Sequence, residues 1–200
     1  MPLFICTLQQ FHLILKYSYK KEGLAIDTLE QRIECKEIDI DATSFYQTIL
    51  LELETLMEDV IGTEESKGFV GMVADHVGAI FHEKYKTHLG GERMSPEVIA
   101  QVLVDLKRRI GGKFSVSAIT PDTIVLQNSR CPFGINVVGK QPLCHMTANV
   151  FGKIVSSENG YAAVELNKTI ANGDGHCHVV VHLKPQQNQK DVAHEYFGVQ

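Results

Sequence analysis

The hydrophobic pattern of this chain changes its period at Gly111-Gly112, and this change limits the possible folds more than any other feature. Before the two glycines, apolar residues recur at every third or fourth position, which is the spacing of an amphipathic helix. After them, apolar residues alternate, which is the spacing of a half-buried strand. We therefore expect an α+β fold, with N-terminal helices followed by antiparallel β-hairpins that flank one helix.

The first half of the chain predicts three helices between residues 43 and 110. Each begins at a residue whose side chain can cap a helix N-terminus, and each ends at glycine. The caps are Asp41 or Thr43, Thr63 and Ser95, and the stops are Gly62, Gly90 and Gly111. The apolar residues expected to face the core are Phe45, Ile49, Leu53 and Leu56, then Phe69, Val73, Val77 and Ile80, then Val98, Val102 and Leu106.

The second half, residues 113–183, predicts two antiparallel hairpins around one helix. The sequences KFSVSAI and TIVLQN, separated by Thr-Pro-Asp, form the first hairpin. Residues 161–170 and 177–183 form the second, because Asn-Gly and Asp-Gly pairs lie between them. The helix between the hairpins starts at Pro142, stops at Gly160 and faces inward with Leu143, Met146, Val150 and Ile154.

The signals of regular structure divide the chain into three parts. Residues 1–40 carry no clear pattern, and we interpret them as an N-terminal extension or linker. Residues 41–184 form the α+β domain. Residues 185–200 are a polar C-terminal tail, in which only His194–Val199 carries the apolar side chains needed to dock.

Charge and hydropathy argue against nucleic-acid and membrane partners. The formal net charge is −5, and no basic stripe of the kind that binds nucleic acid occurs. The densest basic run, residues 106–109, ends a predicted helix, where cations complement the helix dipole, so we interpret it as solvated surface. The apolar residues 1–16 include Gln9, Gln10 and His12, are shorter than the roughly 18–20 residues that span a bilayer, and lack signal-peptide features. We expect a cytoplasmic protein with reduced cysteines.

Three of the five cysteines lie at the ends of predicted elements. Cys131 is in a Pro-Gly turn, Cys144 is in the first turn of a helix, and Cys177 begins a strand. The helix N-terminus is expected to lower the pKa of the Cys144 thiol. With His145 or His176 as a fourth ligand, the three cysteines could form a tetrahedral zinc site. Two alternatives remain open: the thiols are inert core residues, or they form a redox-active cluster or disulfide.

Several segments resemble the methanogen output domain family, which is similar to the vinyl-reductase-like ligand-binding domains of bacterial aromatic sensors. They are CPFG at 131–134, LCHMTANVFGKI at 143–154, GDGHCHVVVHL at 173–183 and LVDLKRRIGGKF at 103–114. The resemblance covers roughly residues 43–183. It implies a sensory or output part of a signalling system, including transcription regulation, with an undefined small-molecule ligand.

The resemblance also implies a zinc site. In the aromatic-sensing relatives, an early helix cysteine, a Glu-x-x-Cys pair and a later cysteine bind the metal; Cys144, Glu165 and Cys177 match three of these positions. Lys168 replaces the middle cysteine, and Cys131 could substitute for it. Glu165 is the weakest candidate, because a simple hairpin places it far along the strands from Cys177, facing His182 instead. We expect His178 and His182 to point away from the core.

The sequence favours a small-molecule or redox sensing domain, with zinc as the only candidate cofactor. We expect a homodimer formed through the N-terminal helices, a separate signalling partner protein and no catalytic activity. The chain has no G-x-S-x-G elbow and no H-E-x-x-H helix. Two alternatives are a cysteine-dependent hydrolase or reductase, suggested by Cys144 beside His145, and a structural protein-interaction module with inert cysteines. Adjacent helical side chains diverge by about 100°, which disfavours the first.

Overall fold

The structure is a computed structural model that describes residues 40–186 and 193–198. It divides into two compact units, Met1–Ser44 and Phe45–Gln200. In the described part of the first unit, the Asp41 carboxylate accepts a hydrogen bond from the Ser44 backbone N–H at 2.6 Å, and the Ser44 hydroxyl accepts one from the Asp41 N–H at 2.9 Å. Asp41 therefore caps the first described helix, as predicted. The description below concerns the second unit.

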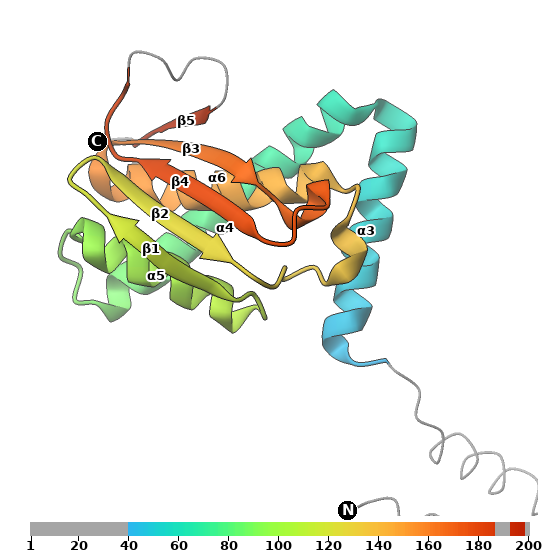
Figure 1. Ribbon diagram of the computed structural model, residues 1–200, viewed down its shortest axis with the longest axis horizontal. Helices are drawn as coiled ribbons and strands as arrows, with labels where there is room; N and C mark the ends of the chain where they lie inside the picture. Colours follow the sequence, from blue (N-terminus) through green and yellow to red (C-terminus); the bar gives the residue numbers. More distant parts are fainter. Residues whose placement is uncertain (1–39, 187–192, 199–200) are drawn as a thin grey trace, which may run out of the picture. The chain divides into compact units, whose positions relative to one another are not determined.

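The order of the elements confirms the predicted α+β class, with helices first and an antiparallel sheet after them (Figure 1). Their bounds are α3 Ala42–Ile61, α4 Thr63–His88, α5 Pro96–Arg109, β1 Phe114–Ile119, β2 Thr123–Asn128, η1 Ile135–Val137, α6 Gln141–Asn159, β3 Tyr161–Lys168, η2 Ile170–Asn172, β4 Cys177–His182 and β5 Ala193–Phe197. None of the helices in these ranges is long and apolar enough to cross a membrane.

The five strands form one antiparallel sheet in the order β1-β2-β4-β3-β5. Both predicted hairpins are present, as β1–β2 and β3–β4, and β2 joins them by pairing with β4. The fifth strand comes from the segment that we interpreted as a polar tail. It pairs with β3, with Tyr161 opposite Phe197 and Glu165 opposite Ala193.

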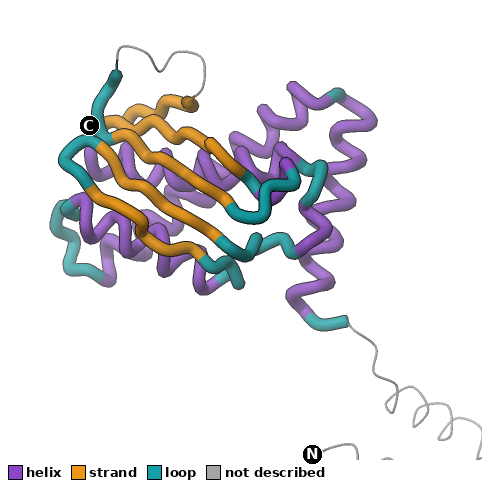
Figure 2. The backbone as a smooth tube through the Cα atoms, in the orientation of Figure 1, coloured by secondary structure: helices purple, strands orange, loops and turns teal. Residues whose placement is uncertain are grey.

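The core lies between the sheet and helices α4, α5 and α6, which cover one face of the sheet (Figures 1 and 2). The alternation of β2 and β4 directs Ile124, Leu126, Val179 and Val181 into this layer. Phe151 of α6 is fully buried there, and its ring meets Phe114 of β1 edge-on at 5.6 Å between centroids.

The predicted inward faces of α5 and α6 are largely confirmed. Ser95 caps α5 by accepting a hydrogen bond from the Val98 N–H, with Pro96 in the first turn. Val102, Leu106, Leu143, Val150 and Ile154 are buried, whereas Val98 is half exposed.

The predicted inward faces of α3 and α4 are wrong. On α3, Leu51 and Glu54 are the buried residues, and on α4 the buried row is Ser66, Val70, Ala74, Gly78 and His82. Most of the large apolar residues that we placed inside are exposed: Phe45, Ile49, Leu53, Leu56, Phe69, Val73 and Ile80.

A close approach of two helices explains the error on α4. A Cβ on Gly78 would lie 2.8 Å from the Lys153 Cβ of α6, so α4 approaches α6 closely at small residues, while Phe69, Val73 and Ile80 lie outside the contact. The predicted cap of α4 is also wrong: Gly62, with φ +88°, occupies the N-cap position, and the helix starts at Thr63 without a side-chain cap.

Candidate functional site

Cys131, Cys144 and Cys177 lie together at one end of the sheet. Cys131 follows β2, Cys144 is in the first turn of α6, and Cys177 is the first residue of β4. The pairing of β2 with β4 places Asn128 opposite Cys177, and the Asn128 amide donates to the Cys177 sulfur at 3.6 Å. A turn, a helix start and a strand start thus meet at this end of the sheet, whereas a shared site of the three thiols stays a prediction.

The three cysteines line one cavity between α6 and the sheet. Its volume is about 20 Å³, which is room for roughly one water molecule. Around the thiols the wall is mainly apolar, formed by Phe114, Pro132, Phe133, Leu143, Leu166 and Val179. Asn128, Thr147 and Thr169 are the polar residues in this wall. We call this space the thiol cavity.

The thiols of Cys131 and Cys144 are held in their neutral form. Burial raises the pKa of the Cys144 thiol to about 11, and hydrogen bonds with Thr169 and the Ala171 backbone only partly oppose it. Burial also raises the pKa of Cys131, against a hydrogen bond with the Phe133 backbone. Our expectation that the helix N-terminus would favour a Cys144 thiolate is therefore wrong, because desolvation exceeds the helix-dipole effect.

A second, more polar cavity of about 150 Å³ adjoins the thiol cavity. Cys144, Leu166 and Thr169 belong to the walls of both. His145 lines the second cavity together with Gln141, Asn172 and His194. The rings of His145 and His194 meet edge-on at 4.9 Å between centroids, so β5 brings a second histidine to this site. We call it the histidine cavity.

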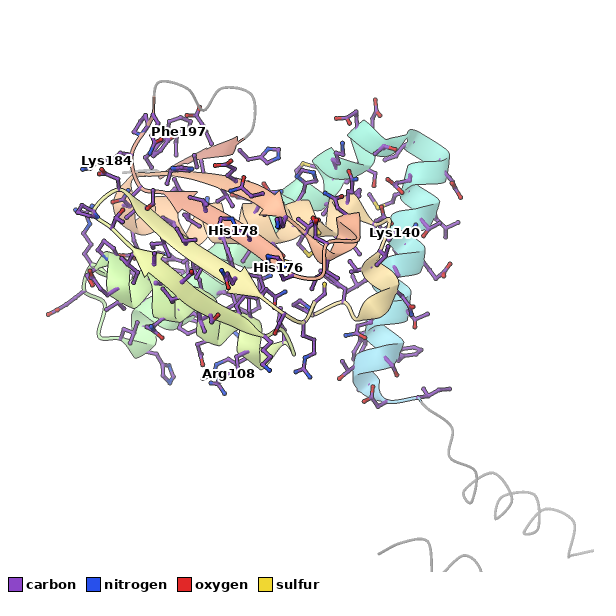
Figure 3. The ribbon with its side chains drawn as sticks, viewed as in Figure 1. Arg108, Lys140, His176, His178, Lys184 and Phe197 are labelled. Carbon is purple, nitrogen blue, oxygen red and sulfur yellow. The ribbon has the colours of Figure 1, made fainter. Side chains whose placement is uncertain are left out.

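The other predicted fourth ligands lie elsewhere. Glu165 is opposite Val180, before a bulge in β3, and its carboxylate contacts the His182 Nε2 at 3.2 Å. His176 is exposed in the turn before β4 (Figure 3). His182, which we expected to be solvated, is buried against Glu165. His178 is partly buried.

Within residues 40–186 and 193–198, no group of three or more His, Cys, Asp or Glu residues is gathered closely enough to hold a metal ion. The three thiols have the chemistry that zinc prefers, but not its geometry in this arrangement. The zinc site stays a prediction, and it would require the cysteine side chains to move together.

Lys107 is the functional candidate that sequence reasoning missed. We interpreted residues 106–109 as solvated, and Arg108 and Arg109 are indeed exposed, both paired with Asp105. Lys107, however, is 4% exposed. Its Nζ donates to the Thr147 hydroxyl at 2.9 Å and lies 5.8 Å from the centroid of the Phe114 ring. The spacing of four from Leu103 to Lys107 was the available signal, because it continues the buried face of α5.

Helix α3 contacts the wall of the thiol cavity. The Gln47 amide donates to the Pro132 carbonyl at 2.5 Å, and Pro132 lies in the segment that closes the cavity. On its other side, the Pro132 ring packs where Gly112 leaves space; a Cβ there would lie 3.0 Å from the Pro132 Cγ. Farther along α3, the buried Glu54 carboxylate pairs with Lys140 at 3.3 Å, where α6 begins (Figure 3).

Comparisons with known proteins agree with the resemblance described above. No curated protein sequence matches the chain. Among solved structures, the phenol-responsive sensory domain of the transcription activator PoxR, crystallised with phenol, is similar with a TM-score of 0.58 and 16% sequence identity. The match covers 72% of this chain and 76% of that one, and at this identity it shows a shared fold. A family model described as methanogen output domain 1 matches residues 49–182. The chain therefore belongs to the methanogen output domain 1 family.

Proposed function

We propose that this chain is a small-molecule sensing domain of a signalling system. The observation that carries the proposal is the pair of adjoining cavities between α6 and the sheet, which share a wall at Cys144, Leu166 and Thr169. A site with an apolar inner part and a few polar groups at its mouth is typical of small-molecule binding. Membership of an output-domain family and the fold shared with a phenol-responsive sensory domain support the same role.

The size and chemistry of the two cavities favour a small amphipathic ligand. The histidine cavity, at about 150 Å³, has the volume that accommodates a benzene-sized molecule in other proteins. Its histidines and amides would bind the polar end of such a ligand. The apolar wall of the thiol cavity would bind the other end, after a rearrangement that enlarges it.

A route for the signal leads from the cavity wall to α3. A ligand that enlarges the thiol cavity displaces Pro132. This movement would stretch or break the hydrogen bond that the Gln47 amide donates to the Pro132 carbonyl. Helices α3 and α4 both expose large apolar side chains, and exposed apolar patches are typical of protein–protein interfaces. We propose that a second copy of the chain covers them, so that ligand binding alters a homodimer that a partner protein reads.

A ligand screen tests the sensing function directly. Thermal unfolding of the full chain is measured with millimolar phenol, benzoate, phenylacetate, acetate and the amides of the three acids. A binding probe raises the midpoint, and Leu166→Trp, which fills the shared wall of both cavities, abolishes the increase. Glu52→Gln on the exposed side of α3 is the control and keeps it. If no probe shifts the midpoint of the wild-type chain, the sensing proposal is wrong.

Zinc binding by Cys131, Cys144 and Cys177 is a narrower proposal. It is supported by the convergence of three thiols on one cavity of the volume of a single water. A bound metal would contribute to folding, so Cys144→Ser and Cys177→Ser should lose zinc and thermal stability together, whereas His176→Ala should lose neither. Metal analysis of untagged protein from zinc-supplemented medium decides this. If the wild-type protein contains no stoichiometric zinc, the zinc proposal is wrong, and the thiols are only part of the wall of a ligand-binding cavity.

The arrangement gives little support to a cysteine-dependent enzyme. A nucleophilic cysteine needs a base within hydrogen-bonding reach, yet Cys144 hydrogen-bonds with Thr169 while His145 packs on His194. We infer a non-catalytic domain. An interaction module with inert thiols is the outcome if neither a small molecule nor a metal binds.

A further inference from the structure

We propose that Lys107 is the recognition group for the carboxylate of a small organic acid, which binds in the thiol cavity with its apolar part against Phe114 and Phe133. This inference rests on the proposed sensing function and specifies the chemical class of the ligand. It is carried by the position of one buried ammonium group and by the groups around it.

Lys107 lies directly behind the cavity wall. Its Nζ donates to the Thr147 hydroxyl, and it lies over the rings of Phe114 and Phe151 at 5.8 and 5.2 Å from their centroids. Thr147 and Phe114 both line the thiol cavity. A ligand group that displaces these two side chains would approach the ammonium, because both contact Lys107 and both line the cavity.

The ammonium of Lys107 has no carboxylate partner among residues 40–186 and 193–198, although it is the only buried lysine in these ranges. Five other lysines form ion pairs with carboxylates, yet their side chains are between 23% and 65% exposed and need this pairing less. They are Lys67, Lys86, Lys140, Lys153 and Lys184. A buried charge is costly unless it is paired. Of these lysines, Lys107 is therefore the one at which pairing with a bound anion would stabilise the protein most.

Lys107 keeps its charge at neutral pH. Burial lowers its pKa to about 8, so most molecules are protonated at pH 7. The cysteines Cys131, Cys144 and Cys177 oppose this effect of burial but do not cancel it, and one hydroxyl and two aromatic faces do not neutralise the charge. The carboxylate of a ligand would neutralise the charge of Lys107. The hydrogen bond between them would also be strong, because hydrogen bonds to charged groups are stronger than those between neutral groups.

The small volume of the thiol cavity has a consequence for this binding. A cavity of about 20 Å³ does not hold an organic acid, so the acid must displace part of the wall. Pro132 and Phe133 form the part of the wall outside the sheet and α6, and Pro132 is bonded to Gln47 of α3. Binding at Lys107 would therefore shift the segment that contacts α3.

The test compares each acid with its amide on the full chain. Isothermal titration at pH 7 measures acetate, benzoate and phenylacetate against acetamide, benzamide and phenylacetamide. At least one acid should bind about tenfold or more tightly than its amide, as expected for a hydrogen bond to a charged group. Lys107→Met keeps the length of the side chain and should bind acid and amide equally. Lys113→Met, at an exposed position on the same segment, should keep the preference.

The outcomes separate this inference from the sensing function. If the amides bind as well as the acids, or if Lys107→Met keeps the preference for acids, the role of Lys107 is wrong and the sensing function stands. If no probe binds the wild-type chain, both proposals fail. Near-ultraviolet circular dichroism of Lys107→Met confirms folding; removal of an unpaired buried charge should raise its unfolding midpoint in the absence of ligand.

Discussion

The aromatic ring of Tyr196 in β5 lies directly against Gly152 of α6, where a Cβ on the glycine would come within 2.0 Å of the ring. The Tyr196 hydroxyl donates to the Asn149 side-chain oxygen, one turn earlier on α6, at 2.7 Å. Glycine is unfavourable within a helix, so this position gives up helix stability to admit the ring. The contact attaches the last strand, which carries His194, to the helix that carries Cys144 and His145.

Gly152→Ala should therefore displace β5. Overpacking of a tight contact costs about 1–3 kcal/mol, which exceeds the gain of about 1 kcal/mol from replacing glycine in a helix. We expect a lower free energy of unfolding and faster hydrogen exchange in residues 193–197. Gly68→Ala in α4 is the matched control, because nothing lies within 4 Å of its Cβ position, and it should stabilise the chain. Equal effects of the two substitutions would refute the assignment.

Glu158 should make the stability of the fold depend on acid pH. Burial raises the pKa of this carboxyl, but its hydrogen bonds with the Met94 N–H at 2.8 Å and with His82 at 2.5 Å have a larger, opposite effect. The pKa of Glu158 therefore lies below its usual value. Because the folded-state pKa is depressed, the stabilisation is present above the unfolded-state pKa near 4.5 and is lost as the pH falls through the folded-state pKa.

Glu158→Gln should consequently destabilise the chain at pH 7 by about 2–4 kcal/mol, since it leaves the His82 side chain without its charged partner. The difference from wild type should shrink below about pH 4. Urea unfolding across this range measures it. Glu83→Gln, which removes an exposed carboxylate 3.4 Å from the same histidine, should change little. If the loss of unfolding free energy in Glu158→Gln does not vary with pH, then packing, and not charge, explains the effect.

Dimer formation should depend on the exposed apolar residues of α3 and α4. Leu56→Glu and Phe69→Glu each place a charge at an exposed position, so folding should persist while association is lost. Light scattering at tens of micromolar should show a dimer for the wild-type chain and a monomer for each variant. Glu52→Gln, a neutral change on α3, should remain dimeric. A wild-type chain that is monomeric under these conditions would contradict the homodimer.

Alkylation should report the neutral state of the thiols. A pKa of about 11 for Cys144 reduces its thiolate fraction at neutral pH by at least about a hundredfold relative to an unperturbed cysteine. Peptide mapping after iodoacetamide treatment should show slow modification of Cys144 at pH 7 and a steep increase above pH 9. Rapid modification at pH 7 would indicate a thiolate and favour a redox-active cluster.

Sequence periodicity predicted the four strands of the two hairpins, though not β5, because alternation in residues such as Val179 and Val181 follows directly from burial of one sheet face. It failed for α3 and α4. There, the large apolar side chains do not all mark the packed face, since small residues such as Gly78 and Ala74 form much of it on α4. Small inward residues give almost no hydrophobic signal in a sequence.

Two features of the candidate site could not be predicted from the sequence, because they depend on contacts between segments that are distant in the chain. The position of Lys107 inside the core follows from the packing of α5 on the first strands, whereas a run of basic residues normally indicates surface. The docking of β5 depends on the space at Gly152, 44 residues earlier than Tyr196. The positions of Cys131 in a turn, Cys144 at a helix start and Cys177 at a strand start, in contrast, could be predicted, because each lies beside a clear boundary signal.

The central place of β4 in the sheet has a consequence for how the chain folds. The β1–β2 hairpin can form as soon as residue 128 is synthesised, but its inner edge pairs only with β4, and Asn128 meets Cys177 across 49 residues. Until then, the main-chain groups of β2 have no strand beside them and offer a template for another chain. Closing so long a loop is slow compared with forming a hairpin. The nascent chain should therefore be most prone to aggregate in the interval before β4 leaves the ribosome.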